Sequence, residues 1–414
     1  MLKTICFSNT GCSAEDEDFL RLMRILGAER TQNIFEADCI VQHFCGMSTE
    51  NYEVIPKCMF VLEKIKEERP EVKIFVGGCA SEVLNFQKRY PFVDGVFARR
   101  HMIEDLSQYL GFDPECDKEP ICNHNAVRIQ SGCLRQCGFC KKHYMSMPLI
   151  SKPLEQVIKD VKEVLKNGHS EVILLAENST EYGIDLGYRL IDLLKELENK
   201  TQIERICLTA LCIDELVLMP ELVDYIADHK EIVSVQIEIQ SLIPLVRKNM
   251  RLTSTREEVL KICKRFSKKR ITTNIMVGYP GENKVDFDEQ LDLIKENGLY
   301  YIQVNEFDAT PGTPGYEMEQ INPSIVQKRL LKMMNLLTLL KREKANGMIN
   351  SAQKGYTGVA MGKGTLLLNG ESILVSVNED IELTYGKEYM VKVTGVDQLF
   401  TGKEQNMRLK GVLL

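Results

Sequence analysis

The chain has 414 residues, a formal net charge of −7, 44% hydrophobic residues and 27% charged residues, which is ordinary for a soluble protein of two or three domains. No apolar run approaches the roughly 18 residues that span a bilayer, and the first residues turn acidic too early for a secretory signal. We therefore expect a cytoplasmic protein with no membrane partner, and one with no global attraction to nucleic acid.

Strands and helices alternate through the first part of the chain. Apolar runs predict strands at 2–9, 39–44 and 73–80, and amphipathic patterns predict helices at 15–28 and 52–70. This alternation predicts a parallel α/β domain over residues 1–110. Cys12, Cys45 and Cys79 lie at or just beyond the ends of the three strands, at the edge where open α/β sheets bind ligands. We expect these three thiols to converge on one metal centre.

The alternation resumes after a stretch rich in Pro and Asp, residues 111–125, which we interpret as a linker. Strands are expected at 126–131, 170–178, 205–211, 232–240, 271–282 and 300–307, and helices at 153–168, 188–200, 220–230, 255–270, 285–298 and 324–344. About six such units over residues 126–345 predict a partial or full β/α barrel with its active edge at the strand C-termini.

The last part of the chain has a different pattern. Residues 345–355 are expected to form a hinge, and short strands separated by Gly-marked turns follow over residues 350–414. This spacing predicts a small all-β barrel. From Lys354 onward the chain has seven Lys or Arg and seven Asp or Glu, so the barrel is neutral overall. The most basic run is 261–270, for which the solvated face of a helix is the simpler interpretation.

The sequence SGCLRQCGFC places Cys133, Cys137 and Cys140 in a CxxxCxxC spacing. Thiolates select zinc, Cu(I) or iron–sulfur centres. A structural zinc site would need a fourth ligand, for which His124 or His143 is the candidate. A redox pair of the last two cysteines would leave the first unexplained. The remaining interpretation is a [4Fe–4S] cluster held by three thiolates, with one iron left open.

An open iron can chelate an amine and a carboxylate, and S-adenosylmethionine (SAM) offers both. One electron from the cluster then cleaves the sulfonium and yields a 5′-deoxyadenosyl radical. The missing fourth thiolate is thus interpreted as the reactive coordination position.

A CxxxCxxC motif with an aromatic residue before its last Cys, at the first strand of a β/α barrel, resembles the radical SAM superfamily. Over nearly its whole length the chain resembles the methylthiotransferase branch, whose members join an N-terminal cluster domain, a radical SAM domain and a C-terminal TRAM barrel. The segments TGCSAED, EADCIVQHFC and KIFVGGCA match its N-terminal cysteine positions, and EVILLAENSTEYG, EIQSLIPLVRKNM, TTNIMVGYPGE and FDATPGTPGYEM follow in order.

This resemblance implies two [4Fe–4S] clusters, one held by Cys12, Cys45 and Cys79 and the other by the cysteines of the CxxxCxxC motif. It also implies two SAM molecules. The first methylates a sulfur of the auxiliary cluster, and the second gives the radical that takes hydrogen from a substrate C–H bond. The substrate carbon then collects the methylthio group. An electron donor such as flavodoxin or ferredoxin is implied as a partner, and no catalytic residue is assigned beyond the cluster ligands.

Five further residues are expected to contact SAM. Phe139 would lie against the adenine, with core packing as the alternative. Glu177 and Asn178 end an apolar run where the family meets the methionine part of SAM, with ordinary turn residues as the alternative. Glu238 and Gln240 alternate with apolar residues on one strand, so their side chains share a face and point to a ligand in a barrel.

The sequence also departs from the family pattern. His43 and Phe44 stand where the family usually has Asn-Thr, and Asn274 stands where an Asp is common; these changes bear on the substrate. Family acceptors are adenosine-37 derivatives of tRNA or a residue of a protein or peptide. The segments at 239–241 and 311–315 look more like the tRNA branches, so tRNA is expected first and a protein or peptide second. A metal-stabilised RNA-binding protein without enzyme activity is the alternative from another class.

Overall fold

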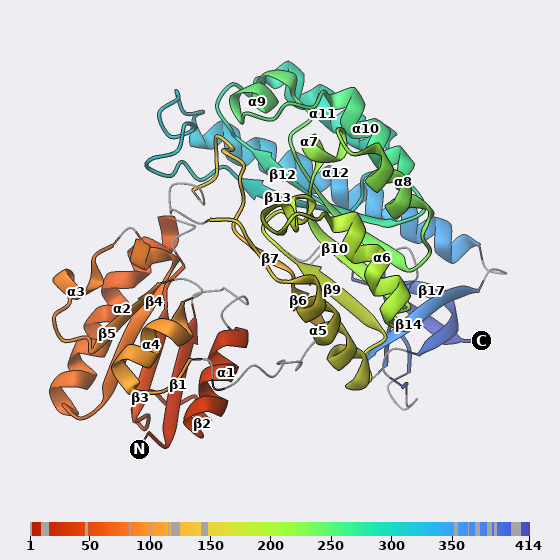
Figure 1. The fold of residues 1–414 in the computed structure, drawn as a ribbon. Helices are drawn as coiled ribbons and strands as arrows, with labels where there is room; N and C mark the ends of the chain where they lie inside the picture. Colours follow the sequence, from red (N-terminus) through yellow and green to blue (C-terminus); the bar gives the residue numbers. More distant parts are fainter. Residues whose placement is uncertain are drawn as a thin grey trace. The chain divides into compact units, whose positions relative to one another are not determined.

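The structure is a computed structural model that describes residues 2–9, 16–45, 49–82, 84–98, 101–114, 116, 125–141, 148–351, 355–362, 364–368, 373–378, 383–384, 387–398 and 407–414. The chain divides into two units, Met1–Ile121 and Cys122–Leu414 (Figure 1). Across the described segments, every helix is too short or too polar to cross a membrane.

The first unit is a five-stranded parallel sheet in the order β2-β1-β3-β4-β5. Its elements are β1 (Thr4–Asn9), α1 (Asp16–Leu26), β2 (Glu29–Thr31), β3 (Cys39–His43), α2 (Thr49–Glu68), β4 (Lys73–Gly78), the 3₁₀ turn η2 (Cys79–Glu82), α3 (Phe86–Arg89), β5 (Gly95–Ala98) and α4 (Met102–Leu110). The predicted parallel α/β unit is confirmed. Two strands, β2 and β5, and two helices, α3 and α4, were not predicted; the two strands are too short to show a period.

Each face of this sheet packs against its own pair of helices. Ile40 and Val76 belong to a core that includes Met59 from α2. Val41 and Phe75, one position away on the same strands, belong to a second core built with α1 and α4. Successive residues of a strand point to opposite faces, so the near-continuous apolar runs of β3 and β4 are what a sheet covered on both sides requires.

The register aligns the carboxyl ends of the three central strands. Asn9 pairs with His43, and His43 pairs with Gly77. The strand order reverses direction between β1 and β3, which is where open α/β sheets form their ligand crevice. Gly78 has a φ of +91°, and a Cβ there would lie 2.4 Å from the His43 ring. The buried imidazole therefore occupies space that only a glycine leaves open.

The second unit is built on six parallel strands in the order β13-β12-β11-β10-β9-β6. The strands are β6 (Ala126–Arg128), β9 (Glu171–Leu175), β10 (Arg205–Cys212), β11 (Ile232–Gln240), β12 (Arg270–Val277) and β13 (Ile302–Glu306). The helices are α5 (Leu154–Lys166), α6 (Leu190–Lys200), α7 (Ile213–Leu216), α8 (Pro220–Asp228), α9 (Pro244–Asn249), α10 (Arg256–Arg265), α11 (Lys284–Glu296) and α12 (Pro323–Asn350). Since β6 and β13 are the two edges, the predicted barrel is a partial one.

The expected strand at 126–131 is divided in the structure. After β6 the chain leaves the sheet, and β7 (Gln130–Ser131) pairs antiparallel with β8 (Ile150–Ser151) instead. The Ile129 amide still donates to the Leu175 carbonyl oxygen at 2.9 Å, so the departure begins there. This early departure frees the following residues to form a loop.

The hinge expected at 345–355 is wrong for its first half, because α12 runs on to Asn350. Ala345 and Met348 are buried in the same core as Tyr301 and the barrel residue Ile373, and this packing holds the last turns of the helix in place. The predicted all-β barrel is confirmed as a closed barrel in the order β14-β15-β16-β18-β17. Its strands are β14 (Tyr356–Gly362), β15 (Thr365–Leu368), β16 (Ile373–Ser376), β17 (Glu388–Gln398) and β18 (Met407–Leu413).

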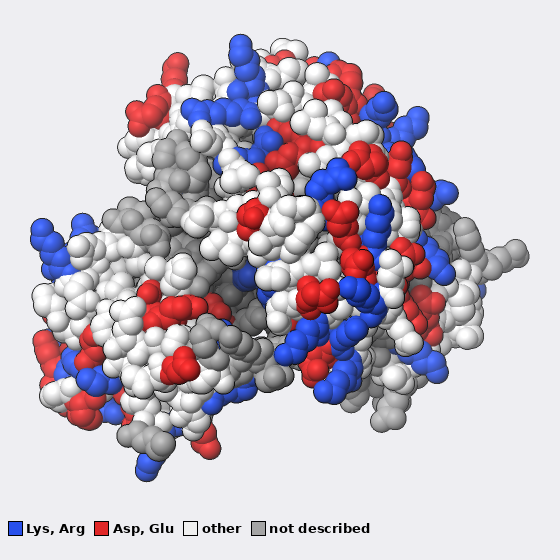
Figure 2. Space-filling model, in the orientation of Figure 1, with Lys and Arg blue, Asp and Glu red and all other residues white. Residues whose placement is uncertain are grey.

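Acidic and basic side chains are intermixed over α5, α6 and α8 on the face shown in Figure 2. Within the basic run 261–270, Arg265 pairs with Asp224 at 2.9 Å and with Asp228 at 2.8 Å. Lys269 is buried against the His229 carbonyl oxygen. These contacts favour a structural role for this run over a role as a nucleic-acid surface.

Candidate functional site

Three half-buried thiols stand on one loop after β7. The Cys140 amide donates to the Cys137 carbonyl oxygen at 3.1 Å, which turns the chain between the two residues. Burial raises the pKa of Cys133 to about 12, and the Glu181 carboxylate adds to the rise. Burial also raises the pKa of Cys137, while the Arg135 guanidinium opposes that rise. Such thiols are protonated in the free chain, and binding of a metal releases the protons.

The donor set fits a cluster better than a single ion. Among the residues that the structure describes, no three His, Cys, Asp or Glu side chains are placed to hold one metal ion. His124 and His143, the candidate fourth ligands of a zinc site, lie outside the described residues. A [4Fe–4S] cluster bonds its thiolates to separate irons, so three sulfur donors spread along one loop are suited to it.

Backbone contacts hold the cysteine loop, residues 132–141, against two other loops. The Gly138 amide donates to the Met250 carbonyl oxygen at 2.9 Å, and the Gly315 amide donates to the Gly138 carbonyl oxygen at 2.8 Å. A Cβ at Gly138 would lie 2.7 Å from the backbone oxygen of Asn249. Only glycine therefore lets the loop approach this closely.

Two carboxylates from the segment after β9 also hold the cysteine loop. Glu177 accepts a hydrogen bond from the Gly132 amide at 3.1 Å, and Glu181 accepts one from the Leu134 amide at 2.9 Å. Glu177, predicted as a SAM contact, therefore lies against the loop backbone. Burial raises the pKa of Glu181, although the loop amide opposes the rise. Glu181 could not be predicted from the sequence, because it lies on a single 3₁₀ turn without a periodic pattern.

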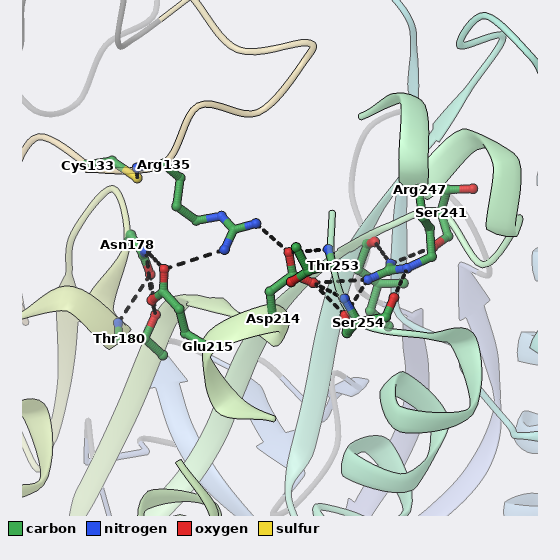
Figure 3. Close-up of polar contacts among 11 residues, drawn as sticks. Cys133, Arg135, Asn178, Thr180, Asp214, Glu215, Ser241, Arg247, Thr253 and Ser254 are labelled. Atoms are coloured by element: carbon green, nitrogen blue, oxygen red, sulfur yellow. Dashed lines mark hydrogen bonds and ion pairs between the residues drawn. The ribbon is translucent and has the colours of Figure 1, made fainter. Parts of the chain in front are cut away.

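Arg135 connects the cysteine loop to the polar edge of the sheet (Figure 3). Its guanidinium donates to Asp214 and lies 3.6 Å from a Glu215 oxygen. The Glu215 carboxylate also accepts hydrogen bonds from the side-chain amide of Asn178 at 3.0 Å and from the Thr180 hydroxyl. Asn178, predicted as a SAM contact, is buried and belongs to this network.

Asp214 is the centre of the network. It accepts hydrogen bonds from the amides of Thr253 at 2.9 Å and Ser254 at 3.0 Å, and it pairs with Arg247 at 3.2 Å. Burial acts to raise the pKa of Asp214, but the Ser254 hydroxyl, the Thr253 and Ser254 amides and the Arg135 guanidinium hold this pKa below its ordinary value. The carboxylate is therefore ionised and shared by two arginines.

Arg247 is almost wholly buried and fastens the end of β11. It donates to the carbonyl oxygens of Ile239 at 2.9 Å, Ser241 at 2.8 Å and Ser254 at 2.8 Å. Two of these oxygens flank Gln240, whose φ of +62° is uncommon for a residue with a side chain. Strained backbone of this kind persists only where its surroundings hold it.

The remaining predicted cofactor contacts lie elsewhere on this unit. Glu238 accepts hydrogen bonds from Gln236 at 3.0 Å, Gln240 at 2.8 Å and Asn274 at 2.8 Å. The carboxylate thus belongs to a polar cluster on β11 and β12. Phe139 is half-buried and packs against the core of the sheet, a position that fits core packing and leaves part of its ring accessible.

In the first unit, Cys45 and Cys79 follow the ends of adjacent strands at equivalent positions. The Phe44 carbonyl oxygen accepts from the Ala80 amide at 3.1 Å, which ties the two segments together. Cys79 is buried and Cys45 is half-buried. Cys12, the third predicted ligand, lies outside the described residues.

Comparison with known proteins agrees with this arrangement. Residues 127–294 match the model of the radical SAM superfamily. The chain is 26% identical to tRNA-2-methylthio-N(6)-dimethylallyladenosine synthase of Petrotoga mobilis, over 92% of this chain and 94% of that protein. It is 27% identical to ribosomal protein uS12 methylthiotransferase RimO of Carboxydothermus hydrogenoformans, over 79% of this chain and 80% of that protein.

Among solved structures, the fold is similar to the radical SAM methyltransferase TsrM of Kitasatospora setae, with a TM-score of 0.53, 10% identity and coverage of 73% of each chain. It is also similar to the radical SAM enzyme OxsB, with a TM-score of 0.52, 12% identity and coverage of 81% of this chain and 56% of the other. The relatives in sequence are enzymes, against the alternative of a non-enzymatic scaffold. Over most of its length the chain is therefore similar to radical SAM methylthiotransferases, and its residues 127–294 match the radical SAM superfamily.

Proposed function

We propose that this protein replaces a C–H bond by C–SCH₃ on a tRNA adenosine-37 derivative, with SAM and two [4Fe–4S] clusters as cofactors. The observation that carries the proposal is the cysteine loop, where three thiols are held in place by backbone and carboxylate contacts at the carboxyl end of β6. The second support is the match to methylthiotransferases over nearly the whole chain.

Cys133, Cys137 and Cys140 would hold the cluster that binds SAM. Cys12, Cys45 and Cys79 would hold the auxiliary cluster in the first unit. When bound, a cluster of the first kind supplies the electron that SAM cleavage requires. The protein's own contribution is to keep three thiols on one rigid loop and to leave the fourth coordination position to the cofactor.

The polar residues at this edge would orient SAM. Glu238 accepts hydrogen bonds from three side-chain amides, and its position on β11 suits a contact to the cofactor, with Gln240 beside it. Phe139 would cover the adenine. Glu177 and Asn178 would act partly through the loop and through Glu215, because the structure already engages both side chains there.

The barrel favours RNA as the acceptor. Arg408 and Lys410 are exposed on β18 and alternate there with buried apolar residues. The register pairs Lys392 of β17 with Val412, which places Lys392 on the same outer face. These three cations, called here the barrel stripe, form the kind of basic row that contacts phosphates. The total charge of the barrel is neutral and does not reveal the barrel stripe, because a total does not say on which strand face each charged residue lies.

The test is anaerobic reconstitution followed by reduction with SAM and either unmodified tRNA or a ribosomal-protein peptide. About eight irons per chain are expected from two clusters, and mass spectrometry should find one methylthio group gained by the tRNA. Cys137→Ala should abolish deoxyadenosine formation, whereas Cys45→Ala should keep SAM cleavage and lose sulfur transfer. Methylthiolation of the peptide alone would overturn the choice of acceptor, and normal sulfur transfer by Cys45→Ala would overturn the auxiliary cluster.

A further inference from the structure

One cation of the second unit lies inside the cysteine loop itself. The Arg135 amide donates to the Cys133 sulfur at 3.4 Å, and Arg135 stands midway between Cys133 and Cys137 on this loop. Its backbone thus contacts one of the three thiols, and its side chain gives the loop that carries all three a positive charge.

Two carboxylates hold the Arg135 guanidinium in place. Asp214 and Glu215 both come from α7, which directly follows β10, and both lie against Arg135. The Asp214 carboxylate is about 1% exposed and is also paired with Arg247. Two guanidiniums and two carboxylates therefore form a group whose formal charges cancel, and the member that stands on the cysteine loop is the positive Arg135.

We propose that Arg135 is a positioning residue that raises the reduction potential of the cluster bound by the loop cysteines. The inference rests on the proposed function for the cluster itself. Net charge and hydrogen bonds to the sulfurs are among the factors that set the potential of such clusters. Reduction adds one negative charge beside the guanidinium, so the reduced form is the one that Arg135 stabilises.

A purely structural role would have a different signature. Arg135 links the loop to a buried carboxylate, and its loss would loosen the loop whether or not charge matters. A partner of opposite sign separates the effect of charge from the effect of structure. Glu215 lies 3.6 Å from the guanidinium, so Glu215→Gln removes a negative charge near the loop without changing a loop cysteine.

The experiment uses the full-length chain with Cys45→Ala and Cys79→Ala, so that only the loop cluster contributes to the signal. After anaerobic reconstitution, the reduced fraction is followed by electron paramagnetic resonance during a redox titration without SAM. In Arg135→Gln the ratio of reduced to oxidised cluster at a fixed potential should fall about tenfold, a shift of about 59 mV for one electron. In Glu215→Gln the ratio should rise, and in Lys195→Gln, a matched loss of an exposed charge on α6, it should not change.

Each outcome has a defined meaning. If Arg135→Gln binds full iron and sulfide and titrates like Lys195→Gln, the inference is wrong. If Arg135→Gln fails to bind a cluster, Glu215→Gln decides, and an unchanged or lower ratio there rejects the inference. A parent chain that binds no iron and sulfide refutes the cluster assignment and this inference together, whereas a complete cluster indifferent to both charges refutes only the inference.

Discussion

The buried Arg247 offers the most stringent test of how the site is held together. Replacing it with Met leaves three backbone carbonyl oxygens without their donor and removes one of the two guanidiniums that neutralise Asp214. Breaking a buried ion pair from one side costs about 3–5 kcal/mol. We expect Arg247→Met to lower the opening free energy of this region by that amount. The opening free energy of Arg247→Lys should lie between that of the unchanged chain and that of Arg247→Met, because an ammonium cannot make all the hydrogen bonds of the planar guanidinium.

The measurement is hydrogen exchange read by mass spectrometry on peptides covering the end of β11 and residues 249–256. At about 1.4 kcal/mol per tenfold change, the expected loss is roughly two to three and a half orders of magnitude in protection, up to the limit set by global unfolding. Arg189→Met is the control: its ion pair with Glu221 is exposed on both sides, so protection should stay within about twofold. A change of less than about threefold in Arg247→Met would show that the network does not hold this edge.

Three further outcomes are expected. Gly138→Ala puts a Cβ 2.7 Å from the Asn249 backbone oxygen and 2.7 Å from the Tyr279 hydroxyl, so iron binding should fall. The control is Gly347→Ala, whose Cβ meets open space in α12. It should leave iron binding intact and raise the free energy of unfolding by up to about 1 kcal/mol. Burial lowers the pKa of Lys341 to about 8, so the unfolded chain binds more protons between pH 8 and 10.5 and stability should rise with pH there. Lys341→Met should therefore stabilise the protein by roughly 3 kcal/mol at pH 7, and the gain should vanish above about pH 10.5 in urea melts compared at both pH values. Replacing the three cations of the barrel stripe with Gln should weaken tRNA binding, leave SAM cleavage unchanged and reduce the slope of log K against log[salt] by about three. An unaltered slope would show that the tRNA does not bind at the barrel stripe.

The parallel sheet of the first unit could be predicted because its central strands β3 and β4 are buried on both faces and read as apolar runs. The placement of Cys45 and Cys79 side by side could be predicted because each follows one of these strands, and strand ends in a parallel sheet meet at one edge. The thiol spacing of the cysteine loop needed no structure at all. Each of these signals is local in sequence.

The network behind the loop could not be predicted in this way. Arg135, Asp214 and Arg247 come from three segments, and each looks like an ordinary charged residue in its own context. Only the fold shows that the three meet and that Asp214 is shared. Asn178 was predicted as a SAM contact, and that stays a prediction. Its hydrogen bond to Glu215 could not be predicted, because that contact crosses from one strand end to the next.

The continuation of α12 has a consequence for how an acceptor meets the enzyme. At 1.5 Å per residue its 28 residues make a rod about 42 Å long. Its far turns are embedded in the barrel core, while Met333 and Leu337 are embedded in the core of the six-stranded sheet. The barrel therefore cannot swivel independently of the sheet that carries the thiols. A nucleic acid bound to the barrel would therefore be held in one orientation relative to the sheet. Selection among substrates would then depend on the length and curvature of the nucleic acid.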